Sequence, residues 1–209
     1  MNEKVYNRNE ILAQKVIKAL ESRNMSAYYA ADRKEALQKA LELIPEGSTI
    51  SMGGATSAIE IGLVDALKTE KYNYIDRNAA ADRRAAELAA FDADYFLSSV
   101  NAMTEDGVLV NIDGNANRVA AISFGPKHVL FIVGMNKICR DLDAAIKRAR
   151  NVAAPVNAMR LNTATPCGKD GACHDCKSPE TICCQFLVTR FSRHPGRIQV
   201  ILVNDDLGF

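Results

Sequence analysis

The sequence lacks the features that would place it in several specialised classes of protein. It has 26 basic and 25 acidic residues and a net charge of +1, so it offers no concentrated basic face for a nucleic acid. Its most apolar segment, HVLFIVGM, is too short to span a bilayer, and its first ten residues are polar, unlike a signal peptide. It shows no repeat, low-complexity tract or linker. We therefore expect one cytoplasmic domain over residues 1–209, without nucleic-acid binding or membrane insertion.

Two familiar phosphate-binding motifs are also missing. The turn Gly53-Gly54-Ala55-Thr56-Ser57 follows a predicted strand, but it lacks the lysine of a P-loop and the full G-x-G-x-x-G of a dinucleotide fold. The two glycines let the backbone approach a ligand, and the hydroxyls of Thr56 and Ser57 lie near free helix N–H groups. This pattern indicates a site for a phosphate or carboxylate, with Glu60 one turn further on as a catalytic candidate. A tight turn with a Ser or Thr N-cap is the alternative.

Cysteine, in contrast, is concentrated in one place. Five of the six cysteines lie in the stretch TPCGKDGACHDCKSPETICC, which forms a Cys-rich loop over residues 162–185. Its glycines and proline favour a loop, and thiolates gathered at loop spacing favour a metal site. The alternatives are a disulfide-stapled loop or a redox pair of Cys173 and Cys176, which a reducing cytosol disfavours. Cys184 directly follows Cys183 and is expected to point away. The predicted metal ligands are Cys167, Cys173, Cys176 and Cys183.

Strands and helices alternate along most of the sequence. Apolar residues at helical spacing between Ile11 and Leu20 predict a first helix, and Asp32 is placed to cap a second. The apolar run at 128–134 is typical of a strand covered on both faces. Further strands are expected at 48–54, 72–77, 93–102, 107–114 and 197–205, and further helices at 55–68, 79–91 and 141–161, the last with a kink at Pro155. The alternation predicts an α/β fold, a mainly parallel sheet with helices on both faces.

Polar residues crowd the ends of predicted strands between residues 98 and 118. As a group, beside a single arginine and an apolar stretch, they resemble the hydrogen-bonding walls of a small-molecule pocket. Each one alone is better explained by the turn that it stabilises, because Asn and Asp in turns usually bond to the backbone. The candidate ligand-binding residues here are Asn101, Thr104, Asn111, Asn117 and Arg118, and the candidate catalytic carboxylates are Glu105 and Asp113.

The same stretch carries a family resemblance. SSVNAMTEDGVLVNIDGNANRVAAISFGPKHVLFIVGMNKI resembles the LUD domain, the lactate-utilisation protein C (YkgG-like) family. The resemblance continues through AAIKRARNVAAPVNAMRLN into the cysteine segment and includes SMGGATSAIEIGL upstream. It therefore covers most of the chain from about residue 45 onward.

That resemblance implies a Rossmann-like fold of the NagB/RpiA/CoA-transferase group. Relatives with this fold bind anions at a strand-end glycine turn, which here is the turn at Gly53 and Gly54. The family is associated with iron–sulfur proteins that oxidise L-lactate, so such subunits are expected partners. The chain departs from longer relatives because it has no ferredoxin-like C-x-x-C-x-x-C repeat. Glu105 lacks the neighbours that mark the acyl-accepting carboxylate of a CoA transferase.

Two classes of function fit these observations. The first is a component of an iron–sulfur-dependent L-lactate oxidation system that binds a small anionic metabolite at the glycine turn. The second is an enzyme of the sugar-phosphate isomerase or CoA-transferase type with a structural zinc loop, or a non-catalytic assembly module. Zinc and an iron–sulfur cluster both accept four thiolates, and the pathway favours iron–sulfur. The sequence leaves open whether the chain is an enzyme and whether it forms a homo-oligomer.

Overall fold

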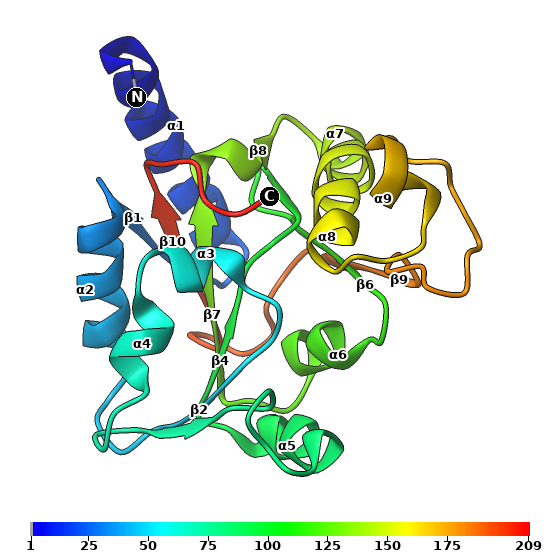
Figure 1. Cartoon of the computed structure of the whole chain (residues 1–209). Coiled ribbons are helices and arrows are strands. Elements are labelled where there is room, and N and C mark those ends of the chain that lie inside the picture. Colours follow the sequence, from blue (N-terminus) through cyan, green and yellow to red (C-terminus); the bar gives the residue numbers. More distant parts are fainter. Residues whose placement is uncertain (1) are drawn as a thin grey trace.

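The computed structural model describes residues 2–209, whose central feature is a parallel sheet of six strands (Figure 1). The strand order is β1-β10-β7-β4-β2-β3, and every neighbouring pair runs parallel. The mainly parallel sheet predicted from the alternation is confirmed. Its strands are β1 (Ser26–Ala30), β2 (Thr49–Met52), β3 (Asn73–Ile75), β4 (Tyr95–Ser98), β7 (His128–Gly134) and β10 (Ile198–Val203).

Both faces of this sheet are covered, and the central strand β7 shows why. Leu130 and Ile132 pack with the helices of one face, whereas Val129, Phe131 and Val133 pack with the other, as the alternation of side chains along a strand requires. All five side chains are fully buried, so the continuous apolar run is explained. The first face carries α2 (Arg33–Leu43), α3 (Thr56–Glu60) and α4 (Leu63–Leu67), and the second carries α1 (Glu3–Ser22) and α6 (Asn117–Ser123).

A second, smaller sheet is not distinguished by the sequence pattern. Its order is β8-β5-β6-β9, with β6 antiparallel to both of its neighbours. Strands of two to five residues are too short to reveal which sheet they join. The expected strand at 93–102 is in fact the whole of β4 followed by a crossing into this sheet, where β5 begins at Ala102. Its strands are β5 (Ala102–Thr104), β6 (Leu109–Asp113), β8 (Ile138–Cys139) and β9 (Gln185–Thr189).

Two helical predictions differ in detail from the structure. The segment 55–68 forms α3 and α4 rather than one helix, because Gly62 between them adopts a φ of 79°. The segment 141–161 is a helix in three parts, α7 (Leu142–Arg148), the π-helical turn η3 (Ala149–Ala153) and α8 (Ala154–Arg160). Pro155 lies in the first turn of α8, where its missing N–H group and the wider π turn are compatible. The capping role of Asp32 is confirmed, since its side chain accepts a hydrogen bond from the Glu35 amide.

The cysteine segment lies beside the second sheet, between α8 and β9. In Figure 1 it is the yellow-to-orange loop on the right, on the side away from α2. The other elements are α5 (Arg83–Ala89), η1 (Ala90–Asp92), η2 (Met135–Lys137) and α9 (Pro166–Asp170). Among residues 2–209, no helix has the length and apolar character needed to cross a membrane.

Candidate functional site: a basic cleft beside a cysteine pocket

A cleft of about 220 Å³ lies at the carboxyl edge of the parallel sheet. Ligand sites of open α/β sheets lie at this edge, because the loops that leave neighbouring strands meet there. The glycine turn after β2, the residues after β4 and Lys137 after β7 all contribute to it. Its lining residues are Gly54, Thr56, Arg77, Arg83, Ser99, Val100, Asn101, Ile112, Asp113, Gly114, Asn115, Asn117, Arg118, Lys137, Asn157, Arg160, Leu161, Ile182 and Phe209.

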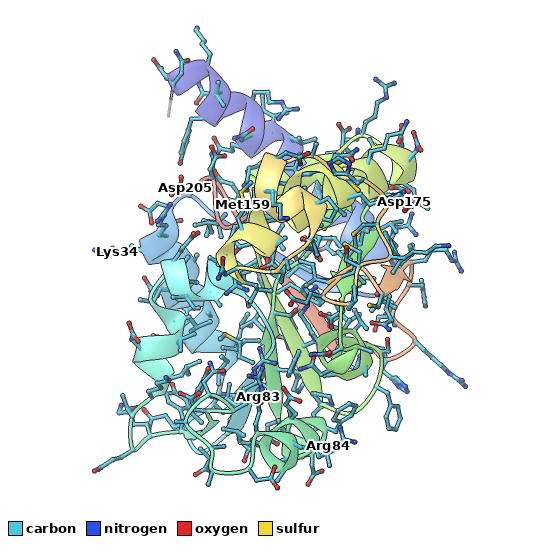
Figure 2. All side chains as sticks on the ribbon, turned by 45° about the vertical axis from the view of Figure 1, so that its right-hand side comes forward. Lys34, Arg83, Arg84, Met159, Asp175 and Asp205 are labelled. Atoms are coloured by element: carbon cyan, nitrogen blue, oxygen red, sulfur yellow. The ribbon has the colours of Figure 1, made fainter. Side chains whose placement is uncertain are left out.

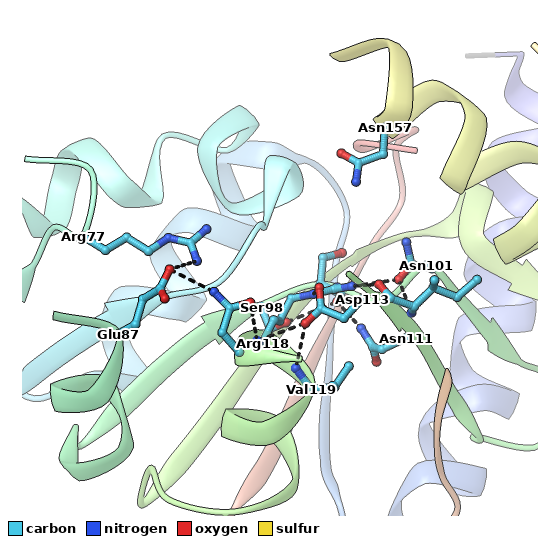
Figure 3. A network of polar contacts seen from close by, with 12 residues as sticks. Arg77, Glu87, Ser98, Asn101, Asn111, Asp113, Arg118, Val119 and Asn157 are labelled. Atoms are coloured by element: carbon cyan, nitrogen blue, oxygen red, sulfur yellow. Dashed lines mark hydrogen bonds and ion pairs between the residues drawn. The ribbon is translucent and has the colours of Figure 1, made fainter. Parts of the chain in front are cut away.

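Arg118 is the centre of a hydrogen-bond network in the cleft (Figure 3). Its Nη1 donates to the Ser99 carbonyl at 3.2 Å, and its Nη2 donates to Asn101 Oδ1 at 3.0 Å and to the Ile112 carbonyl. Only 8% of the residue is exposed. Burial lowers the pKa of the guanidinium, and the nearby Asp113 carboxylate partly offsets this effect. The network fixes a positive charge at the inner wall of the cleft.

Asp113 and Gly53 hold Arg118 from two sides. The Asp113 carboxylate accepts hydrogen bonds of 3.0 Å from the backbone amides of Arg118 and Val119, so it stabilises the start of α6. Its other oxygen lies 3.7 Å from Arg118 Nε. On the opposite side, a Cβ added to Gly53 would stand 2.7 Å from Arg118 Cγ. A glycine is therefore required at position 53 because the arginine side chain crosses directly over the turn.

The cleft has an excess of positive charge. Arg77 and Arg83 share the carboxylate of Glu87, at 3.6 and 3.1 Å, and Asn117 donates to the same carboxylate. Arg160 on α8 donates to Asn157 Oδ1 and has no carboxylate within salt-bridge distance among the described residues. In Figure 3, Asn157 stands above the network and points toward it. Five basic side chains line the cleft against the carboxylates of Asp113 and Glu87, an arrangement suited to an anion.

Lys137 is a cleft residue that the sequence reasoning missed. It is only 2% exposed, and its Nζ donates to the hydroxyls of Ser57 and Ser99 at 3.0 Å each. Burial lowers its pKa to about 7, with Arg148 and Arg118 contributing in the same direction and Glu60 opposing them. Its position directly after an apolar strand, in the same kind of loop as the glycine turn, was the available signal.

Six of the predicted cleft residues lie together. Gly54, Thr56, Asn101, Asp113, Asn117 and Arg118 line the cleft, while Gly53 packs under Arg118 and Ser57 contacts Lys137. The remaining four lie outside it. Glu105 pairs with Lys15 of α1 at 2.6 Å, Thr104 accepts from the Val108 amide in a tight turn, Asn111 donates to the Ser99 carbonyl from its buried position, and Glu60 accepts from the Gly208 amide.

The four cysteines predicted to bind a metal line a second, smaller pocket of about 50 Å³. Arg150 of η3 also borders this pocket, and its Nη2 pairs with Asp175 at 2.5 Å and contacts Cys173 Sγ at 3.8 Å. Cys184 is exposed and its thiol donates to the Thr181 carbonyl instead. Figure 2 shows Asp175 and Lys34 of α2 on opposite sides of the view.

The thiols differ in their readiness to ionise. Hydrogen bonds from Ser178 lower the pKa of Cys176, whereas burial and the neighbouring thiols raise the pKa of Cys183 to about 11. All six cysteines are free. Within residues 2–209, no three His, Cys, Asp or Glu side chains are grouped closely enough to hold a metal ion as they stand. The sulfurs thus surround the pocket without meeting at one point.

The cleft and the cysteine pocket share a wall. Ile182, between Thr181 and Cys183, lines both of them. The contact is close at Gly114, where an added Cβ would lie 3.2 Å from Ile182 Cα and 3.4 Å from the Thr181 carbonyl. A family model described as the LUD domain matches residues 13–203, which include every residue named in these two sites except Gly208 and Phe209.

The chain belongs to the LUD domain family. The recognition made from the central motif and the cysteine segment is therefore confirmed. No curated protein matches the chain. The structure of this LUD domain is similar to that of a DUF162 family protein from Deinococcus radiodurans, with a TM-score of 0.54 and 14% identity over 93% of this chain and 98% of that one. At this identity the similarity shows the fold alone.

A second solved structure is less similar to this LUD domain. It is eIF2B delta from Chaetomium thermophilum, with a TM-score of 0.36 and 18% identity over 67% of this chain and 57% of that one. The family membership supports a role in lactate utilisation in general terms. The ligand of the cleft and the occupant of the cysteine pocket stay predictions.

Proposed function

We propose that this LUD domain binds a small anionic metabolite in the basic cleft and carries a metal centre in the cysteine pocket, as a component of an iron–sulfur-dependent L-lactate oxidation system. The observation that supports the first part is the charge of the cleft. Arg77, Arg83, Arg118, Lys137 and Arg160 line a space of about 220 Å³ whose wall contains one carboxylate side chain, that of Asp113. A carboxylate or phosphate of a small metabolite is the ligand that this environment stabilises best.

The cleft also has the polar groups needed to orient such a ligand. The Asn157 amide and the guanidinium of Arg160 face it from α8, while Thr56 offers a hydroxyl beside the glycine turn. A cleft lined by a few convergent polar side chains on a rigid sheet edge is the usual form of a small-molecule site. The dimensions suit a compact metabolite rather than a nucleotide.

The second part of the proposal is supported by the thiols of the cysteine pocket. Four sulfurs surround one small pocket, and Arg150 places a positive charge where thiolates would need one. A zinc ion requires every sulfur about 2.3 Å from a single point. The thiolates of an iron–sulfur cluster bind different iron atoms and stay farther apart, so sulfurs that surround a pocket favour the cluster. When bound, such a cluster supplies a one-electron carrier.

The wall shared at Ile182 would place the metal centre of the cysteine pocket close to the metabolite in the cleft. A centre in the cysteine pocket would lie on the other side of one side chain from a metabolite in the cleft. An electron carrier placed there is close to a metabolite that gains or loses electrons. A purely structural zinc loop would not need this position.

The test combines metal analysis with ligand titration. Protein purified without oxygen is assayed for iron, zinc and sulfide and its absorbance spectrum is recorded. L-lactate, pyruvate and phosphate are then titrated by calorimetry. We expect iron and sulfide in the protein and binding of at least one carboxylate with a dissociation constant that rises with salt. Protein with neither iron nor zinc would disprove the metal centre, and the absence of any anion binding would disprove the cleft.

Two neighbouring arginines provide a matched pair of variants. Arg83 lines the cleft, whereas Arg84 is exposed and does not. Arg83→Met should weaken anion binding by about fivefold to tenfold, the effect of one charge-assisted contact, while Arg84→Met should leave it unchanged. Equal effects of the two variants would show that only the overall charge of the protein matters.

A further inference from the structure

Lys137 is the one basic residue of the cleft that is buried without a carboxylate partner. It lies in η2, directly after β7, and only 2% of it is exposed. Buried lysines are rare unless they are paired with an acid. Among the described residues, its Nζ is within hydrogen-bond distance only of the hydroxyls of Ser57 and Ser99. The exposed arginines already attract an anionic ligand. The burial of Lys137 without an acid therefore needs another explanation.

The direction of the serine hydrogen bonds follows from counting hydrogens. Ser99 Oγ lies 2.7 Å from the Ile132 carbonyl and donates its only hydrogen to it. Ser57 Oγ lies 3.2 Å from Ser99 Oγ and must therefore be the donor of that pair. Both hydroxyl hydrogens are thus used, and each hydroxyl accepts from Lys137. Neither serine is arranged to give a proton to the lysine, so this is not a serine nucleophile with a lysine base.

One bonding direction of Lys137 Nζ is not used by the two serines and is available for a reaction. Two of its hydrogens bond to the serine hydroxyls, and what remains is a hydrogen in the ammonium form or a lone pair in the amine form. Burial and the guanidiniums of Arg148 and Arg118 disfavour the ammonium form, while the Glu60 carboxylate favours it. With a pKa of about 7, the side chain carries on the order of 1,000 times more free amine at neutral pH than an ordinary lysine.

The backbone next to the Lys137 amine leaves no room for a side chain at position 208. Gly208 passes over it with a φ of 54°, and a Cβ there would lie 3.1 Å from Lys137 Nζ and 3.0 Å from Ser57 Oγ. The Gly208 amide is held by the Glu60 carboxylate at 2.7 Å. The amine is thus shielded from bulk water on one side and borders the cleft on the other.

We propose that Lys137 is a nucleophile that forms an imine with the carbonyl group of a small 2-oxo acid whose carboxylate is bound by the arginines of the cleft. This rests on the proposed anion-binding function and names the ligand class. The lone pair of Nζ attacks the carbonyl carbon, a carbon–nitrogen bond forms, and the carbonyl oxygen leaves as water after it has taken up two protons, both of which come from the amine nitrogen as it becomes an imine. A free amine reacts with a carbonyl group, and a cluster of arginines attracts an anion. A single molecule that carries both a carbonyl group and a carboxylate therefore suits the site.

Ser57 and Ser99 are positioning residues in this scheme. They hold two hydrogens of the amine and so direct its third position, and neither touches the carbonyl carbon. They also link the lysine to the sheet, because Ser99 donates to the backbone of β7. An amine held in one orientation loses little freedom when it attacks.

The experiment is reductive trapping. The protein is incubated with pyruvate, the simplest ketone that carries a carboxylate, together with sodium cyanoborohydride, and the modified lysines are located by peptide mass spectrometry. We expect Lys137 to gain one carboxyethyl group in a yield at least about tenfold above that of exposed Lys147. Acetone, which has the carbonyl without the carboxylate, should modify Lys137 much less than pyruvate does. Lys137→Met should lose the adduct, and Lys147→Met should retain it.

The outcomes separate this proposal from the one on which it rests. If calorimetry shows that pyruvate binds but Lys137 in the wild-type protein carries no adduct, the imine is disproved and the anion site stands. If the adduct is spread evenly over exposed lysines, the imine at Lys137 is also disproved. If no carboxylate binds at all, the proposed function fails together with it. Because the wild-type protein is mapped directly, the result does not depend on whether a variant folds.

Discussion

The basic cleft and the cysteine pocket share a wall but are built in opposite ways. In the cleft, Arg118, Lys137 and Ser99 are buried and hydrogen-bonded to the sheet and to one another. In the cysteine segment, Thr165 is the only buried residue between positions 162 and 184. The cleft therefore derives its shape from the hydrophobic core beneath it, whereas the cysteine segment has almost no core of its own.

The difference teaches where the stability of each site must come from. A site on a packed sheet edge is preorganised and needs no ligand to keep its geometry. A segment with few buried apolar side chains offsets little of the conformational entropy that ordering costs, so it depends on cross-links or on a metal. Substitutions in the cysteine pocket should therefore change its structure by removing the bound metal. Substitutions in the cleft should change its structure by disturbing the packing of its side chains.

The largest effect is expected from Cys173→Ser. Loss of one of four ligands should lower the metal content of anaerobically purified protein by at least about tenfold, because the segment has no core to keep the other three in place. The segment should also become sensitive to limited proteolysis, while the rest of the chain stays resistant. Cys184→Ser is the control, since that thiol is exposed and bonds to the Thr181 carbonyl. Equal metal loss in both variants would contradict the assignment of the ligands.

Gly53→Ala should have the next largest effect, and it tests the packing of the cleft. The new Cβ would collide with Arg118 Cγ at 2.7 Å and Phe96 Cζ at 3.1 Å, so we expect the free energy of unfolding to fall by about 1–3 kcal/mol. Anion affinity should fall as well, because the guanidinium must move. Gly54→Ala, one residue away, meets no protein atom within 4 Å and should behave like the wild type in urea titrations. A stable Gly53→Ala variant with normal binding would mean that the cleft is not rigid.

The third and smallest effect is a dependence on pH. Lys137 has a folded-state pKa of about 7, below the ordinary value of 10.5, so the unfolded chain holds more protons between these two values. The contribution of this residue to stability therefore rises as the pH increases from 7 to 10.5 and is lowest at and below pH 7. Arg148, Glu60 and Arg118 are the charged groups that act on it.

Lys137→Met removes this dependence and makes it measurable. The free energy of unfolding of the variant minus that of the wild type should be larger at pH 6.5 than at pH 9.5. The difference between the two pH values should be at least about 1.4 kcal/mol, the value of one pKa unit. Urea unfolding at the two pH values measures the difference, and Lys147→Met is the exposed control. A difference that does not change with pH would show that Lys137 is charged in the folded protein.

The sequence predicts the parts of the molecule that depend on local pattern. The strand β7 and the cap at Asp32 could both be predicted. A strand buried on two faces is a continuous apolar run, and an N-cap is a residue of a particular type before a helix. The strand β1, the helix α6 and the second sheet were not, since short elements depend on what they pack against. The split of 55–68 at Gly62 follows from a left-handed conformation that the helical pattern hides.

The candidate site divides in the same way. Gly53 and Gly54 were predictable from a glycine turn after a strand, and the cysteines from their spacing. Lys137 was not, because a single lysine after a strand is usually exposed, and only the three-dimensional structure brings Ser57 and Ser99 to it. Asn111 and Thr104 look like pocket residues in the sequence but bond to the backbone, Asn111 to the Ser99 carbonyl and Thr104 to the Val108 amide.

The helical stretch that includes the π turn η3 has a mechanical consequence. Arg148 at its beginning donates to the carbonyls of Asn136 and Asn101, next to the lysine and within the cleft, at 3.0 and 2.6 Å. Arg150, two residues later and so on the opposite side of the helix, contacts Cys173 and Asp175. One helical stretch is thus joined to both sites by side chains less than a turn apart. It forms a direct path by which a shift of the cysteine segment can reach the loop that carries Lys137.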